Sequence, residues 1–185
     1  MAIVVDTCSL VMIAKNYLPL DEDGRMVAFI EQAFVNKELL LLDTILGEAR
    51  GISKGVVLEK MKFLDDKNIV INTTDMLPLS PRRFDNMVDN NFCIRLLKKD
   101  FNDEQYIQQK EEFMKSGDAK ILIYCWSKQN NQPDIFVDYC VMTEETRTQN
   151  DGKLFKKLPM LCDFLNVNTT TAVDYLHRNG FKIER

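Results

Sequence analysis

Four acidic residues stand where an α/β protein carries its chemistry. Asp6 ends a short β-branched apolar run, and Glu145 follows the longer apolar run 135–142. Glu48 lies just beyond the first turn of a helix predicted to begin at residues 43–44, and Asp118 lies at the start of a later helix. Ligands bind in the crevice outside the carboxyl ends of parallel strands. We therefore expect all four carboxylates to converge on one crevice.

Clustered carboxylates suggest a particular chemistry. They repel one another and raise one another's pKa unless a cation neutralises them. Hard oxygen ligands suit Mg²⁺ or Mn²⁺ rather than zinc. Such an ion lowers the pKa of bound water and stabilises charge on a phosphodiester during in-line displacement. The pattern therefore predicts metal-dependent hydrolysis of phosphodiester bonds.

Each acid also has an ordinary structural explanation when it is considered alone. Asp6 could cap a helix that starts near Leu10. Glu48 could be a solvent-facing helix residue, and Asp118 an acid favoured by the helix dipole. The order of the acids along the chain is what favours a shared site.

Hydroxyl and basic side chains are the candidates for substrate contacts. The hydroxyls of Thr7, Ser9 and Thr143 could orient a ligand acid or a water, although a cap or turn role fits them equally well. Basic residues could contact phosphates, or simply form solvated faces. They are Arg82, Arg83, Lys98, Lys99, Lys153, Lys156 and Lys157.

Other catalytic classes lack the residues they need. The single histidine, His177, has no Ser or Cys nucleophile motif around it, which argues against a catalytic triad. The seven glycines form neither of the common phosphate-binding loops. A phosphatase that begins with a strand ending in Asp would want a second acid two residues later, where this chain has Cys8.

Composition indicates one soluble globular domain covering residues 1–185, with 45% hydrophobic and 28% charged residues. The net charge of -4 gives no overall attraction for nucleic acid, so such binding needs a local basic face or metal ions. Five scattered cysteines without a C-x-x-C pair are typical of reduced thiols in a cytoplasmic protein. We find no secretory signal and no membrane-spanning stretch, and expect no membrane partner.

The elements that must position these acids alternate between strands and helices. Strands are predicted up to Asp6 and at 39–42, 69–71 and 135–142, with helices at 10–17, 21–36, from 43–44 onward, 57–64, 120–128 and after Thr171. Leu18 to Leu20 is predicted to break the first helix, and 147–157 to be a mobile loop. This alternation predicts the α/β class, a three-layer α/β/α sandwich with a mainly parallel sheet.

The region 78–116 is predicted to add a helical hairpin to this sandwich. Ser80 is expected to cap a helix beginning at Pro81, and a second helix is expected to end near Ser116. We expect this helical arm to grip a substrate or a partner.

The acids, in this order and spacing, resemble those of the PIN-domain nucleases, which include toxins of bacterial toxin–antitoxin pairs. The similarity lies in the run 4–10 around Asp6, Glu48 after the second strand, Asp118 between glycine and alanine, and Thr143 two residues before the last acid. Segment 157–162 also resembles the ending of a little-characterised PIN-like branch of bacterial proteins. The family pattern favours Glu145 over Glu144 and Asp151 as the fourth acid. The arm at 78–116 is longer than a minimal PIN domain needs.

This resemblance implies a metal-dependent endoribonuclease. Asp6, Glu48, Asp118 and Glu145 would bind Mg²⁺ or Mn²⁺, RNA would be the substrate, and an antitoxin protein would be a partner. The alternative is a PIN-like protein-binding module that has lost catalysis. The sequence leaves open whether the chain forms a homodimer.

Overall fold

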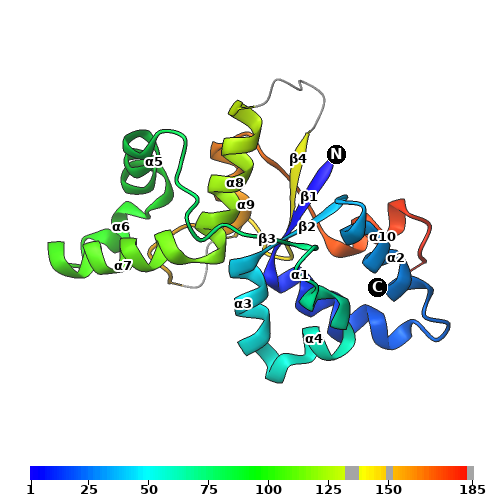
Figure 1. Ribbon diagram of the computed structural model, residues 1–185. Coiled ribbons are helices and arrows are strands. Elements are labelled where there is room, and N and C mark those ends of the chain that lie inside the picture. The colour runs from blue at the N-terminus through cyan, green and yellow to red at the C-terminus, as the bar shows by residue number, and fades with distance from the viewer. Residues whose placement is uncertain (132–137, 149–151, 183–185) are drawn as a thin grey trace.

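The computed structural model describes residues 1–131, 138–148 and 152–182, and its five strands form one fully parallel sheet. The order across the sheet is β3-β2-β1-β4-β5 (Figure 1). The strands are β1 (Ala2–Val5), β2 (Leu39–Leu42), β3 (Val70–Ile71), β4 (Tyr139–Met142) and β5 (Asn168–Thr170). The four predicted strands correspond to β1 to β4; of the predicted strand 135–142, residues 139–142 form β4 and residues 135–137 lie outside the described residues. The strand β5 was not predicted.

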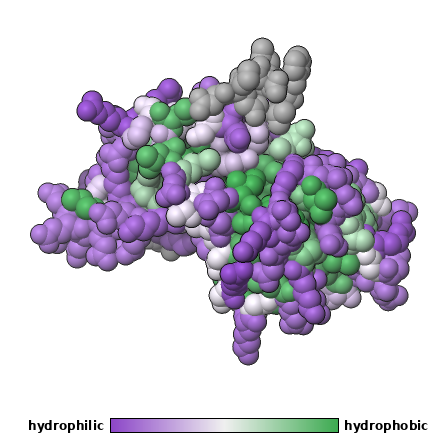
Figure 2. All heavy atoms as spheres, viewed as in Figure 1, coloured by the Kyte–Doolittle hydropathy of each residue, from purple (hydrophilic) through white to green (hydrophobic). Residues whose placement is uncertain are grey.

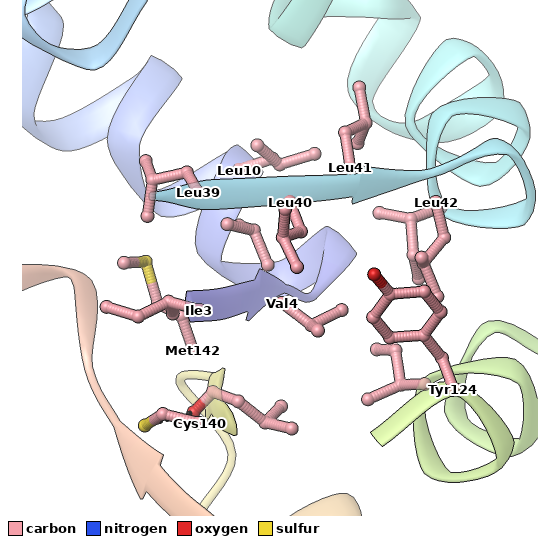
Figure 3. Close-up of a cluster of buried hydrophobic side chains, with 14 of the residues drawn as sticks. Ile3, Val4, Leu10, Leu39, Leu40, Leu41, Leu42, Tyr124, Cys140 and Met142 are labelled. Atoms are coloured by element: carbon pink, nitrogen blue, oxygen red, sulfur yellow. Dashed lines mark hydrogen bonds between the residues drawn. The ribbon is translucent and has the colours of Figure 1, made fainter. Parts of the chain in front are cut away.

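The central strand β1 is covered on both faces, which explains its β-branched sequence. Ile3 pairs with Leu39 of β2 on one side and with Cys140 of β4 on the other. All four residues of β2 are buried, as are all four of β4. In Figure 3, the leucines of β2 pack beside Val4, and Tyr124 reaches in from a neighbouring helix. The core therefore lies on the strands that end at the candidate acids.

Helices cover both faces of the sheet, which gives the predicted three-layer α/β/α arrangement. In Figure 1, α8 and α9 lie on one side of the strands, and α2 and α10 on the other. The α-helices are α1 (Thr7–Met12), α2 (Arg25–Val35), α3 (Asp43–Gly51), α4 (Val56–Lys60), α5 (Pro81–Met87), α6 (Arg95–Lys98), α7 (Asp103–Lys115), α8 (Gly117–Asn131), α9 (Leu158–Phe164) and α10 (Ala172–Arg178). Among the described residues, five short non-α helical segments follow α1, α3, α4 and α5. Two are π-helical, Ile13–Tyr17 and Val88–Phe92, and three are 3-10 turns, Leu18–Leu20, Ile52–Gly55 and Lys62–Asp65.

Several predicted boundaries are wrong for local reasons. The first helix starts at Thr7 rather than Leu10, because Asp6 itself is the cap. The predicted end of this helical segment at Tyr17 is confirmed, and Leu18–Leu20 then forms a separate 3-10 turn. Ser80 precedes α5 as predicted, but its side chain makes no capping hydrogen bond.

The helical arm comprises α5, α6 and α7 and projects to one side of the sheet (Figure 1). Partly exposed ion pairs join the first helix of the arm and the turn after it to the last helix. Lys110 of α7 lies 2.7 Å from the Asp85 carboxylate and 2.9 Å from that of Asp89, and the Tyr106 hydroxyl donates to Asp89 at 2.5 Å. The predicted helical hairpin is present, with the short α6 between its two long members.

The chain segment 152–157 is attached to this arm rather than extending freely as the predicted loop would. Cys93 and Phe155 form an antiparallel bridge. The Ile94 backbone N–H donates to the Leu154 carbonyl at 2.8 Å, and Leu154 is buried. The remaining predicted loop residues 149–151 lie outside the described part of the chain.

The surface view in Figure 2 is mostly hydrophilic, with smaller hydrophobic patches among the polar residues. Within the described ranges, the helices are too short or too polar for any of them to cross a membrane.

Candidate active site

A pocket of about 500 Å³ lies at the carboxyl edge of the sheet, and all four predicted acids line it. They are Asp6, Glu48, Asp118 and Glu145, and we call this hollow the acid pocket. The acids come from the end of β1, from α3, from the start of α8 and from the segment after β4. The parallel sheet thus brings together residues that are far apart in the sequence, as predicted.

Asp6 is both a helix cap and a lining residue of the acid pocket. Its Oδ1 accepts the Thr7 backbone N–H at 2.6 Å, and its Oδ2 accepts from Cys8 Sγ at 2.7 Å and from Thr143 Oγ1 at 3.0 Å. Burial raises the pKa of Asp6; these hydrogen bonds oppose that rise, and the charge of Glu145 adds to it. The carboxylate is therefore held in one orientation at an energetic cost for its charged form.

Glu48 is fixed between two elements. Its Oε2 accepts the Thr7 hydroxyl at 2.6 Å, and its Oε1 accepts the Gly117 backbone N–H at 2.9 Å. A Cβ on Gly117 would lie only 2.8 Å from Oε1 and 2.6 Å from Ile45 Cδ1. Glycine at this position therefore allows the glutamate to reach the amino end of α8.

Asp118 is the acid most affected by its surroundings. Burial is the largest cause that raises the pKa of Asp118, and the charges of Asp6, Glu145 and Glu48 add to it. Together they raise this pKa to about 7. Lys153 lowers that pKa by less than any of these causes raises it. The acids are thus close enough to repel one another, as the sequence predicted.

The two glutamates after β4 have different roles. Glu145 Oε2 accepts the Leu158 backbone N–H at 2.9 Å, and its charge acts on Asp6 and Asp118. Glu144 Oε1 instead accepts the Ala172 N–H at 2.7 Å at the start of α10. Both line the pocket, but the electrostatic coupling supports the choice of Glu145. The third candidate, Asp151, lies outside the described residues.

The three predicted hydroxyl residues all donate to acids at this site. Thr7 donates to Glu48, Thr143 to Asp6, and Ser9 to Glu144 at 3.2 Å. Thr7 and Thr143 therefore orient two of the four candidate acids, whereas Ser9 orients Glu144, which is not one of them.

Among the predicted basic contacts, Lys153 lines the acid pocket and the arginines do not. Arg82 is exposed on α5. The Arg83 guanidinium lies 5.7 Å from the ring centre of Trp126, in a different hollow. The arginine pair is thus placed on the arm, away from the acids.

Sequence reasoning missed Cys8 and Gly117. The Cys8 thiol donates to Asp6 and accepts the Glu144 backbone N–H at 3.2 Å. Burial, followed by the Asp6 charge, raises the pKa of this thiol to about 12, so it stays protonated as a donor. Its position two residues after Asp6, at the first turn of a capped helix, was the available signal. For Gly117, the signal was its place directly before Asp118.

The donor types in the acid pocket suit a hard divalent cation, but their present spacing does not form a complete site. Within residues 1–131, 138–148 and 152–182, no three His, Cys, Asp or Glu side chains are grouped closely enough to hold a metal ion. Asp6, Glu48 and Glu145 each accept hydrogen bonds from protein donors instead. Binding of a cation would require some of these carboxylates to turn from those donors.

Comparisons of the chain with protein-family models, with curated proteins and with solved structures find no match. The fold and the pocket therefore define only a class: a parallel three-layer α/β domain with carboxylates at the carboxyl edge of its sheet. Function has to be argued from the geometry of that pocket.

Proposed function

We propose that this protein is a metal-dependent endoribonuclease of the PIN-like type, which uses Mg²⁺ or Mn²⁺ to hydrolyse phosphodiester bonds in RNA. The observation that carries the proposal is the convergence of Asp6, Glu48, Asp118 and Glu145 on one pocket, where burial and then the charges of the other three acids raise the pKa of Asp118 to about 7. A cluster of this kind is costly for a fold unless a cationic ligand uses it.

The four acids would hold the cation, and their neighbours would orient them. When bound, the ion supplies positive charge for the phosphodiester and makes a water more acidic. Thr143 and Cys8 fix Asp6, and Thr7 and the Gly117 N–H fix Glu48. One of the four carboxylates would help to deprotonate the attacking water.

The biological setting of the proposal is that of a cytoplasmic toxin kept inactive by an antitoxin protein. It rests on the sequence resemblance described above. An antitoxin segment that covers the acid pocket would block access to the four carboxylates. RNA is the proposed substrate, and a homodimer would be compatible with it.

The test is cleavage of a labelled RNA by purified protein with and without Mn²⁺. Asp6→Asn and Asp118→Asn should each lower the cleavage rate by at least about 100-fold, because each removes a charge from the site. Asp85→Asn, which changes an acid of the arm, is the matched control and should cleave normally. Cleavage at the wild-type rate by either pocket variant would show that the assignment is wrong.

A second candidate is a PIN-like binding module without catalysis. The observation in its favour is that the pocket acids accept protein hydrogen bonds and are not preassembled around a cation. Thermal unfolding separates the two functions, since a ligand that binds only the native state must stabilise it. Millimolar Mn²⁺ should raise the melting temperature of the wild type and not that of Asp118→Asn; no rise in the wild type would favour the binding module.

A further inference from the structure

A second hollow adjoins the acid pocket and extends from it under the helical arm. It encloses about 360 Å³ and shares Asp118, Glu145 and Lys153 with the acid pocket. One wall is α7 of the arm, and the other is the segment 152–157. We call it the arm groove. A polymer with one residue at the acids would have its next residue within reach of this groove.

The arm groove combines aromatic and cationic side chains. Phe155 stacks on the buried Phe113, with ring centres 4.4 Å apart and planes at 22°, yet Phe155 remains partly exposed. Lys153 and Lys157 also line the groove. An aromatic face beside cations is the combination that binds single-stranded nucleic acid, with bases on the ring and phosphates on the cations.

Polar side chains of α7 complete the groove. Gln109 and Glu112 line it and are joined by a 3.2 Å hydrogen bond from Gln109 Nε2 to Glu112 Oε2. An amide and a carboxylate can pair with the edge of an unpaired base. Glu112 is an acid on the same wall, so phosphate contacts belong on the opposite wall with the lysines.

The aromatic platform is held firmly from both sides. The bridge between Cys93 and Phe155 ties the segment to the arm, and the Lys156 backbone N–H donates to the Phe92 carbonyl at 2.9 Å. The Lys156 side chain donates to the Asn91 carbonyl at 2.6 Å, so this lysine serves the attachment rather than the groove. A platform fixed in this way loses little entropy when a base stacks on it.

We propose that the arm groove binds the nucleotide next to the scissile phosphate of a single-stranded RNA, with its base against Phe155 and its phosphate at Lys153 and Lys157. This inference rests on the proposed nuclease function and adds the form of the substrate. A base can stack on Phe155 only when its face is uncovered, which a duplex prevents. The arm is therefore the element that makes the enzyme prefer unpaired RNA.

Binding can be measured separately from cleavage. In the Asp118→Asn background, the anisotropy of a fluorescein-labelled single-stranded RNA of about 12 nucleotides is compared with that of its duplex. Phe155→Leu keeps the apolar volume but removes the aromatic face, and should weaken single-strand binding about ten-fold. Lys157→Gln should weaken it about three-fold or more and reduce its salt dependence. Lys62→Gln, at an exposed lysine that lines neither hollow, is the control and should bind normally.

The outcomes separate this inference from the proposed function. If the wild type cleaves RNA while Phe155→Leu and Lys157→Gln bind as tightly as Lys62→Gln, the groove assignment is wrong and the nuclease stands. If both variants bind weakly but the wild type never cleaves, the groove is a nucleic-acid site and the nuclease proposal fails. Equal affinity for single strand and duplex, or no binding of either, would overturn the inference. Lys157→Gln changes a partly exposed side chain outside the core, so it still tests the groove if Phe155→Leu fails to fold.

Discussion

Carboxylates gather in two regions of this molecule, the acid pocket and the helical arm, and their surroundings differ. In the arm, Asp85 and Asp89 share Lys110. Partial burial would raise the pKa of Asp89, but hydrogen bonds from Tyr106 and Lys110 outweigh it and lower that pKa. In the acid pocket the balance is reversed, and the pKa values of Asp6 and Asp118 are raised. The arm acids are thus neutralised by a cation, whereas burial and neighbouring charges disfavour the ionised forms of the pocket acids.

The largest effect should come from adding one methyl group to the acid pocket. Gly117→Ala places a Cβ against Ile45 Cδ1 and Glu48 Oε1, and should lower the free energy of unfolding by about 1–3 kcal/mol through overpacking. It should also reduce RNA cleavage, because Glu48 must move. Chemical denaturation and the cleavage assay measure the two effects.

Gly47→Ala is the matched control for this change. Gly47 lies on α3 and has open space where a Cβ would be, so alanine should stabilise the protein by up to about 1 kcal/mol through helix propensity. If Gly117→Ala is as stable and as active as Gly47→Ala, the contact between Glu48 and Gly117 contributes nothing to stability or cleavage.

Removing a charge from the arm should destabilise the protein, whereas removing one from the acid pocket should stabilise it. Lys110→Met leaves Asp85 and Asp89 without their shared cation, and should cost about 1–2 kcal/mol of stability at pH 7. RNA cleavage at the acids should be unchanged when the fold is intact. Urea unfolding gives the stability, and a loss of cleavage in a fully folded variant would contradict the division between the two regions.

The smallest effect is a gain in stability from removing a pocket acid. Because the pKa of Asp118 is raised to about 7 in the folded protein, the folded state binds the proton more tightly, and stability is lost as pH rises from about 4 to 7. Asp118→Asn should therefore stabilise the protein by about 1 kcal/mol at pH 8, discounted for partial exposure, and by much less at pH 5. Urea midpoints at both pH values check this, and a destabilised variant at pH 8 would mean that the acid is not crowded.

Most of the sheet could be predicted from sequence because four of its strands are short apolar runs followed by polar residues. The strand β5 was missed because Asn168, Thr169 and Thr170 have no hydrophobic pattern, and only pairing with β4 makes them a strand. The start of α1 was misplaced because Asp6 was considered as a cap for Leu10 rather than for the residue that follows it.

The acids of the candidate site could be predicted because parallel strands end at a common edge. Their hydrogen-bond partners could not, because those depend on tertiary packing. Nothing local to Gly117 reveals that Glu48, 69 positions earlier, would reach its backbone N–H. Likewise, the attachment of 152–157 to the arm depends on pairing with residues near Cys93, which a search for periodic patterns does not detect.

The strand order determines when each part of the sheet can form during synthesis. Ile3 of β1 pairs with Leu39 early in the chain but also with Cys140, 137 positions further on. Contacts between such distant residues form slowly, and a ribosome delivers them last. A nascent chain can therefore build half of its sheet around Asp6 and Glu48 while it still lacks Glu145. The four carboxylates of the acid pocket can therefore come together only when synthesis is well advanced.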